Sequence, residues 1–252
     1  RMIGYDNIAP KTLSLPVKTK NISKNFETSC RNFLVNTGFF ETINFPFNDN
    51  VDEAAISVDN PLDKQRSKMR VCITKSLKEN VVYNQNRQKD SIKWFEFSDI
   101  YTKKGNERKL SVMVCGRTNK NFKEFNQQLD YSYLKGLICT IFEELLGEKP
   151  NFEEGKSDNY DLYEKIYFKG SHIGRIGRLS KNFVDSKVKT PVYSFEISID
   201  DLKISEKKYH KTSDFPASYR DLSFSLDSHD SLSDLSNVIT KIIGKNDLLT
   251  DT

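Results

Sequence analysis

Side chains that could do chemistry are spread along this chain without the spacing that catalysis or metal binding needs. Neighbouring carboxylates occur at Glu143-Glu144 and Asp200-Asp201, but adjacent residues on a helix or strand point apart, so neither pair is a ready acid–base dyad. No serine stands in the G-x-S-x-G setting of a hydrolase nucleophile. The histidines are isolated and lack zinc-type spacing: His172, His210 and His229. We therefore predict no catalytic residue and no metal ligand in this chain.

Closely spaced glycines within residues 170–177 invite comparison with a phosphate-binding loop. Such a loop would need a following Gly-Lys-Ser or Gly-Lys-Thr and the start of a helix, and neither is present. Small residues within a β-hairpin are the better interpretation of this run. We therefore predict no cofactor-binding residue either.

The composition indicates a folded protein with an ordinary surface charge. Among 252 residues, 17 Phe and 11 Tyr can supply a sizeable core. The net charge of +4 permits a nucleic-acid partner but does not argue for one. The four cysteines have neither metal-binding nor disulfide spacing, which predicts buried reduced thiols and a cytoplasmic location. No apolar run approaches the roughly 18 residues of a membrane span, and Arg1 indicates an excised segment.

An amphipathic helix and a strand should open the fold, after a linker over residues 1–20. Ser23 can cap the helix, and Gly38 can end it in the left-handed conformation. One face of the helix is apolar and consists of Ile22, Phe26, Cys30, Phe33 and Leu34. A strand is expected over residues 39–47, with its end near a sheet edge because Pro46 lacks a backbone donor.

Residues 57–101 carry the strongest pattern of elements. Asn60-Pro61 should end a short strand, because proline removes a donor and favours extended geometry before it. A helix is predicted from the spacing of Ile73, Leu77 and Val81. Buried strands over 92–101 and 110–115 should then form a hairpin, with Gly105-Asn106 marking its turn.

The remaining elements continue an α+β pattern. A helix opened by Asp130 or Ser132 should run to Gly147, with a wide apolar stripe. Strands over 163–168 and 173–178 flank a short turn. Apolar and polar residues alternate over 193–199, which predicts an antiparallel strand with one face in water. A strand over 222–226 and a helix over 232–242 follow.

Several of these pieces occur in an order that resembles one family. The most specific is Val82-Tyr83-Asn84-Gln85-Asn86-Arg87 at the end of a helix, preceded by Asn-Pro and Met-Arg and followed by Phe-Glu. Two flanking motifs agree: Ile3-Gly4-Tyr5-Asp6-Asn7-Ile8, and Phe215-Pro216-Ala217 with Arg220-Asp221-Leu222. Together they resemble the bacterial phenylalanine–tRNA ligase β chain over nearly the whole sequence.

The resemblance implies a class II aminoacyl-tRNA synthetase-like antiparallel sheet with flanking helices. Residues 1–20 would end a preceding helical domain, and residues 21–212 would form the catalytic-like domain. Residues 213–252 would begin a ferredoxin-like anticodon-binding module, truncated before its second half. The whole enzyme would join phenylalanine to its tRNA, with ATP and Mg²⁺ as cofactors of the holoenzyme and none in this segment.

The resemblance also implies that this segment does not itself catalyse adenylation. Class II ligases hold the ATP α-phosphate with an arginine two residues before a glutamate in their second motif. If Glu96 is that glutamate, the arginine position holds Trp94. The third motif normally carries glycines and a second arginine, and the corresponding Val192 to Leu202 has neither. The expected role is therefore structural.

Partners follow from the same resemblance. The helix over residues 22–37 is expected to contact the catalytic α subunit of an α2β2 heterotetramer through Phe26, Cys30, Phe33 and Leu34, although an amphipathic helix packed on its own sheet is the plainer interpretation. Arg220 is a candidate contact to tRNA, and no membrane partner is expected. Two alternatives stay open: an autonomous nucleic-acid-binding module, favoured by basic side chains clustered with exposed aromatics, and an active small-molecule ligase, favoured by a pocket with two convergent arginines.

Overall fold

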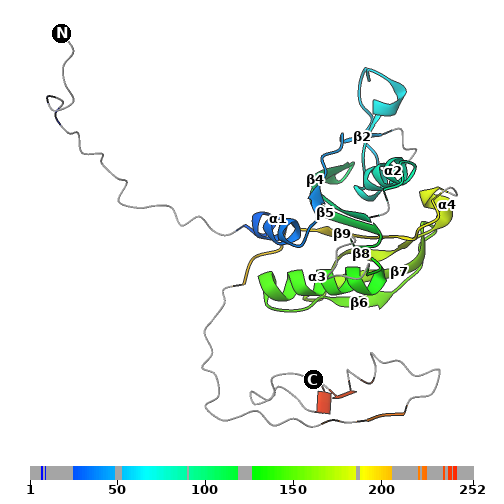
Figure 1. Ribbon diagram of the computed structural model, residues 1–252. Helices are drawn as coiled ribbons and strands as arrows, with labels where there is room; N and C mark the ends of the chain where they lie inside the picture. Colours follow the sequence, from blue (N-terminus) through cyan, green and yellow to red (C-terminus); the bar gives the residue numbers. More distant parts are fainter. Residues whose placement is uncertain are drawn as a thin grey trace. The chain divides into compact units, whose positions relative to one another are not determined.

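A computed structural model describes residues 25–48, 53–89, 91–118, 127–185 and 188–205, together with residues 7, 9, 221, 223–225, 235, 238, 239, 241 and 242. The labelled helices and strands lie between Phe26 and Ser198 (Figure 1). The chain divides into two units, Arg1–Lys207 and Lys208–Thr252, which we treat separately. The domain boundary predicted between residues 212 and 213 stays a prediction.

A seven-stranded sheet is the centre of the first unit. The strands run in the order β1 (Phe40–Glu41), β4 (Ser91–Thr102), β5 (Gly105–Gly116), β9 (Val192–Ser198), β8 (Ser171–Leu179), β7 (Tyr160–Phe168) and β6 (Asn151–Glu154). All neighbours pair antiparallel except β1 and β4, which are parallel. A separate two-stranded sheet joins β2 (Phe47–Asn48) to β3 (Lys68–Met69), beside the short 3₁₀ helix η2 (Lys64–Arg66). The predicted α+β class with a mainly antiparallel sheet is confirmed.

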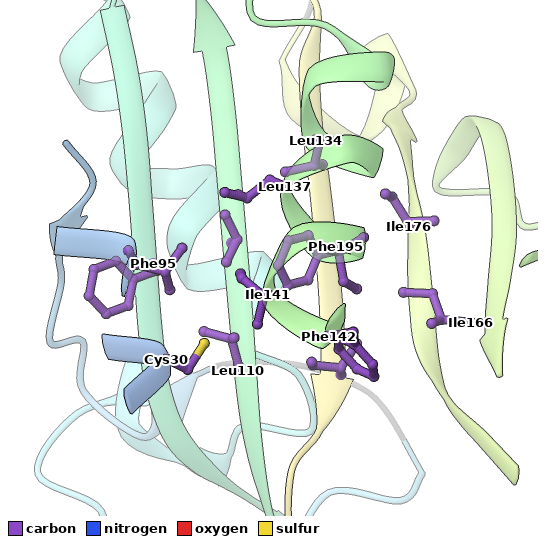
Figure 2. Packing of buried hydrophobic residues seen from close by; sticks show 14 of the residues in the cluster. Cys30, Phe95, Leu110, Leu134, Leu137, Ile141, Phe142, Ile166, Ile176 and Phe195 are labelled. Atoms are coloured by element: carbon purple, nitrogen blue, oxygen red, sulfur yellow. The ribbon is translucent and has the colours of Figure 1, made fainter. Parts of the chain in front are cut away.

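Helices α1 (Phe26–Asn36) and α3 (Tyr131–Leu146) cover one face of the sheet, and their apolar side chains form the larger core (Figures 1 and 2). Phe142 of α3 packs edge-on against Phe168 of β7, with ring centroids 5.1 Å apart. Cys30 is fully enclosed in this core, and burial raises the pKa of its thiol to about 12. The prediction of a reduced, buried thiol is therefore correct for Cys30.

The helix ends follow capping chemistry, with one correction. Asp130, one of the two predicted caps, accepts a hydrogen bond from the Tyr133 amide at 2.9 Å, and Gly147 ends α3 in the left-handed conformation as predicted. Helix α1 instead begins after Asn25, whose side chain accepts from the Glu27 amide at 3.1 Å. The predicted cap, Ser23, lies outside the described residues.

The opposite face of the sheet is covered by α2 (Thr74–Gln85) and by the short helix α4 (Lys181–Val184). Leu77 and Val81 of α2 pack with Ile92 and Met113 of the sheet in a second, smaller core. This coverage overturns one prediction: β9 has no face in water, and both Ser194 and Glu196 are buried. Alternation of polar and apolar residues was misleading because the polar residues are enclosed under α2.

Two further strand predictions need correction. The strand expected over residues 39–47 forms only as β1 and β2, with no regular structure assigned over residues 42–45 between them. The hairpin of β4 and β5 turns at Lys103 and Lys104, so the strands pair as far as Thr102 and Gly105. The turn predicted at Gly105-Asn106 is wrong: both residues belong to β5, because the pairing continues through polar residues that carry no apolar signal.

The glycines of residues 170–177 do belong to a hairpin, formed by β7 and β8. A Cβ atom on Gly177 would lie 2.0 Å from the Leu162 carbonyl oxygen, and one on Gly174 would lie 2.1 Å from the Glu196 carbonyl oxygen. Both glycines are therefore required by close approach of neighbouring strands. The run lies in a β-hairpin and not in a loop that leads into a helix, which is the arrangement of a phosphate-binding loop.

Little of the second unit is described. Residues 223–225 carry no strand, and Phe224 is 53% exposed, so the strand predicted over 222–226 is not formed at its centre. Described residues 235, 238, 239, 241 and 242 are helical, in line with the helix predicted over 232–242. Across the described part of the chain, no helix has the length and apolar character to cross a membrane, and no group of three or more potential ligands could hold a metal ion.

Candidate functional site

One row of polar residues crosses the sheet beneath α2. Strand register places Glu96 of β4 opposite Ser111 of β5, Ser111 opposite Glu196 of β9, and Glu196 opposite Arg175 of β8. In an antiparallel sheet, residues directly opposite one another project from the same face. The two glutamates and the serine are buried, so the row forms a polar layer inside the protein.

Glu196 ties this row to the beginning of α2. Its Oε2 atom accepts hydrogen bonds from the Ile73 and Thr74 amides, both at 2.9 Å, and from Thr74 Oγ1 at 2.8 Å. Its Oε1 atom accepts from Arg175 Nη2 at 3.2 Å. The first amides of a helix attract negative charge, so the carboxylate of Glu196 fills a place where an external anion could otherwise bind.

Arg175 remains charged in this setting. Burial is the largest single influence and would lower the pKa of its guanidinium, but Glu196, together with smaller effects of Tyr160, Cys72 and Tyr163, outweighs burial, and the pKa is raised. The positive charge of Arg175 is therefore balanced by the carboxylate of Glu196 in the same chain.

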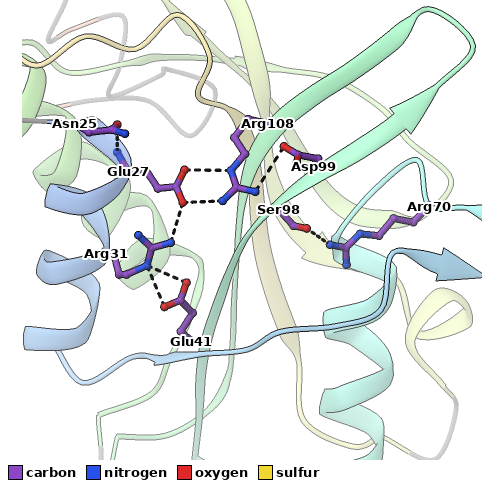
Figure 3. Close-up of polar contacts among 8 residues, drawn as sticks. All are labelled: Asn25, Glu27, Arg31, Glu41, Arg70, Ser98, Asp99 and Arg108. Atoms are coloured by element: carbon purple, nitrogen blue, oxygen red, sulfur yellow. Dashed lines mark hydrogen bonds and ion pairs between the residues drawn. The ribbon is translucent and has the colours of Figure 1, made fainter.

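Glu96 has a buried arginine of its own. Arg70 Nη2 lies 2.7 Å from Glu96 Oε1, with 1% and 2% of the two side chains exposed. Arg70 also donates to Ser98 (Figure 3). Trp94, at the position where the class II motif places an arginine, is only partly buried and packs against the smaller core. Sequence reasoning noted Met69-Arg70 as a motif but missed this pairing, because its partners are 26 residues apart.

A third residue completes the contacts of Glu96. Asn44 donates from Nδ2 to Glu96 Oε2 at 2.7 Å, and its own Oδ1 accepts from Asn80 of α2 at 2.9 Å. The amide of Asn44 also points at Glu96 Oε1, at 3.4 Å. The carboxylate that stands at the glutamate position of the class II motif is thus surrounded by groups of its own chain.

A cavity of about 250 Å³ lies at one end of the polar row, lined in part by Lys109, Glu107, Arg175 and Glu196. Each cation has an acidic partner: Lys109 lies 3.3 Å from Glu107, and Arg175 lies 3.2 Å from Glu196. Arg175 is the single arginine among its lining residues. This cavity therefore does not supply the two convergent arginines that would favour an active small-molecule ligase.

The helix residues predicted to contact a partner lie elsewhere than expected. Phe26, Cys30 and Leu34 have at most 3% of their surface exposed and pack into this chain's own core, and Phe33 is partly buried against it. Phe26, Cys30 and Leu34 therefore offer almost no surface in this chain by itself, whereas part of Phe33 is exposed, and their contact with another subunit stays a prediction. The remaining candidate, Arg220, which was predicted to contact tRNA, lies outside the described residues.

Exposed apolar side chains occur instead just after α1. Phe40 is 69% exposed, Ile43 is 94% exposed and Phe45 is 71% exposed. We call these three residues the apolar ridge. They belong to β1 and the segment after it, at the edge of the sheet where β1 has β4 as its one neighbour. A group of large apolar side chains in water is typical of a protein–protein contact.

Charged residues hold α1 against the sheet near this ridge (Figure 3). Glu27 lies 2.7 Å from Arg108 of β5 and 2.8 Å from Arg31, which in turn lies 3.0 Å from Glu41 of β1. Hydrogen bonding to Arg108 is the largest influence on Glu27 and lowers the pKa of its carboxyl below the usual value, against an opposing effect of burial.

Comparison with known proteins decides the family. The family model described as the phenylalanyl tRNA synthetase beta chain CLM domain matches residues 9–199. The chain belongs to this family. It is 30% identical to the phenylalanine–tRNA ligase beta subunit of Thermotoga maritima, over 90% of this chain and 31% of that protein. The beta subunit of Aquifex aeolicus is 27% identical, over 90% of this chain and 30% of that protein.

Among solved structures, the pyrrolysyl tRNA synthetase of Desulfitobacterium hafniense has a similar fold, with a TM-score of 0.54 and 11% identity over 69% of this chain and 64% of that protein. This likeness confirms a class II synthetase-like fold. The chain spans about a third of the length of the curated relatives it matches, so it corresponds to one portion of a phenylalanine–tRNA ligase β subunit.

Proposed function

We propose that this portion of the β subunit supports attachment of phenylalanine to its tRNA by a partner α subunit, and does not form the aminoacyl-adenylate itself. The observation that carries the proposal is the occupied polar row under α2. Glu196 sits on the first amides of α2, and the two arginines paired with this row, Arg70 and Arg175, are bound to glutamates of the same chain. Stabilising an ATP phosphate needs cationic groups free to meet developing charge.

The remaining expectations belong to the same proposal. The holoenzyme is an α2β2 heterotetramer in the cytoplasm that uses ATP and Mg²⁺ and binds tRNA, and residues 213–252 begin a ferredoxin-like anticodon-binding module in which Arg220 faces tRNA. The family match supports this assignment over an autonomous nucleic-acid-binding module.

The contact with the α subunit is proposed at the outer surface of α1 and at the apolar ridge. The ridge supplies large apolar side chains, and Val35 at the end of α1 adds another that is 52% exposed. Buried interface cores are made from such side chains surrounded by polar residues. The predicted helix thus stays in the proposal, but with its outward residues in place of Phe26, Cys30 and Leu34.

Phenylalanine-dependent ATP–pyrophosphate exchange tests the catalytic part. The purified chain alone should show no exchange above a sample without protein, whereas the full-length β subunit assembled with its α subunit should exchange. Contamination by host ligase is controlled with the variant Arg175→Ala. Exchange by the isolated chain that disappears in this variant would show that the chain is itself a catalyst.

A further inference from the structure

The segment after β1 is attached to the protein at every second residue. Thr42 donates its amide to the Phe95 carbonyl at 2.8 Å, and the Pro46 carbonyl accepts from the Arg70 amide at 2.8 Å. Between them, the Asn44 side chain donates to Glu96. Residues 42, 44 and 46 are half-buried, while residues 43 and 45 are exposed. Exposure thus alternates along the segment: the attached, even-numbered residues face the protein, and Ile43 and Phe45 face outward.

The middle attachment is the one made by a side chain to a buried charge. Glu96 and Arg70 are almost completely buried, and they fix the carboxylate that Asn44 binds. Asn80 holds the other end of the Asn44 amide from α2. Hydrogen bonds to charged groups in such a setting are stronger than those between neutral groups. The side chain of Asn44 is therefore held in one orientation, toward the protein. Its neighbours Ile43 and Phe45 consequently point outward.

We propose that Asn44, bound to the Arg70–Glu96 pair, is a positioning residue for subunit assembly: it presents Ile43 and Phe45 to the α subunit. The inference rests on the proposed function for the identity of the partner. It gives Glu96 a new role, because the carboxylate that matches a catalytic motif orients a contact segment. The α subunit is the occupant we commit to, because the ridge is apolar, lies at an open sheet edge and belongs to a chain whose relatives are named beta subunits.

The first experiment measures the dissociation constant of full-length β subunit for α subunit, together with the melting temperature. Asn44→Ala should weaken assembly roughly tenfold, since losing a hydrogen bond to a charged group frees the segment. Ser98→Ala is the matched control, because it removes a bond to the same arginine without touching residues 42–46. It should lower the melting temperature comparably and leave the dissociation constant unchanged.

A double-mutant cycle separates positioning from general destabilisation. Ile43→Ser with Phe45→Ser should weaken assembly directly, and adding Asn44→Ala to that pair should have no further effect, because Asn44 acts through those two side chains. Additive losses, or normal assembly of Asn44→Ala, would overturn the inference. Dimerisation of the unsubstituted chain through the ridge, without α subunit, would overturn it too. Failure of the unsubstituted β subunit to bind any α subunit would instead reject the proposed function.

Discussion

The pair of Arg70 and Glu96 shows how a buried charge can be necessary without being favourable in itself. Among the nitrogens of Arg70, Nη2 serves Glu96 and Ser98, while Nε and Nη1 are buried without a hydrogen-bond partner. Removing two charges from water costs several kcal/mol per ion, and mutual attraction only about offsets it. The pair thus adds little net stability, but it holds a rigid carboxylate that orients the side chain of Asn44.

Removing one member of this pair should be worse than removing both. Glu96→Ala leaves the Arg70 charge buried and unpaired, and should lower the free energy of unfolding by about 3–5 kcal/mol. The double variant Arg70→Met with Glu96→Leu should recover most of that loss, since neither charge is then buried. Urea denaturation measures both. A double variant less stable than Glu96→Ala would mean that the pair itself stabilises the fold.

For single residues, the sequence could predict that the arginine of the class II motif is missing, but not that Arg70 pairs with Glu96 instead. The absence of an arginine before Glu96 can be seen from two neighbouring positions. The presence of Arg70 beside Glu96 depends on how two separate elements pack, and no local pattern encodes that distance. For the same reason the burial of Phe26, Cys30 and Leu34 could not be distinguished from exposure in a contact: amphipathic spacing marks a face but does not say what covers it.

Among the elements, α2 is attached to the sheet by its first residues as much as by its apolar side. Thr74 contributes its amide and its hydroxyl to Glu196, and it is 2% exposed. The weak amphipathic pattern of the helix is compensated by this polar attachment, because the carboxylate satisfies amides that would otherwise be buried without partners.

Thr74→Val tests this attachment, because valine keeps the shape and removes only the hydroxyl. It should lower the free energy of unfolding by about 1.5–3 kcal/mol, the range for a hydrogen bond to a charged group. Hydrogen exchange of the first turn of α2 should accelerate as well. The matched control is Thr140→Val on α3, whose hydroxyl bonds the Gly136 carbonyl at an exposed position and should matter little. Equal effects of the two substitutions would contradict the proposed attachment.

Elements with local signals were predictable, and those that depend on tertiary cover were not. Helix α3 has its cap at Asp130, its apolar stripe and its terminal glycine within one stretch, so its bounds could be predicted. Strand β9 alternates like a half-exposed strand, yet Glu196 is 3% exposed, because a helix 122 residues earlier in the chain supplies its partners.

For the whole molecule, stability should fall in acid through Glu27. Its pKa is lowered in the folded chain by Arg108 first, so this carboxylate stabilises the fold at pH values above its ordinary pKa of 4.5. That stabilisation is lost as the pH falls from about 4.5 through the lowered pKa of the folded state.

Glu27→Gln should therefore be less stable than the unsubstituted chain at pH 7, and the difference should shrink below pH 4.5. The midpoints of urea denaturation, determined at several pH values from neutral to acid for both proteins, measure this difference in stability. Glu148→Gln, at an exposed position outside the network, is the control and should follow the unsubstituted chain throughout. A constant difference between Glu27→Gln and the unsubstituted chain across that range would contradict the assignment.

The place of β9 between β5 and β8 has a consequence for the newly made chain. Strand β5 ends at Gly116 and β9 ends at Ser198, so the inner edges of β5 and β8 have no partner until the last strand of the sheet is translated. At the usual pace of synthesis the β5 edge stays open on the order of 4–16 s, and the β8 edge, which is complete at Leu179, about 1–4 s. Two open strand edges in a nascent polypeptide are templates for association with other chains. During synthesis this domain therefore passes through a stage in which the unpaired edges of β5 and β8 are available to a chaperone that binds open strand edges.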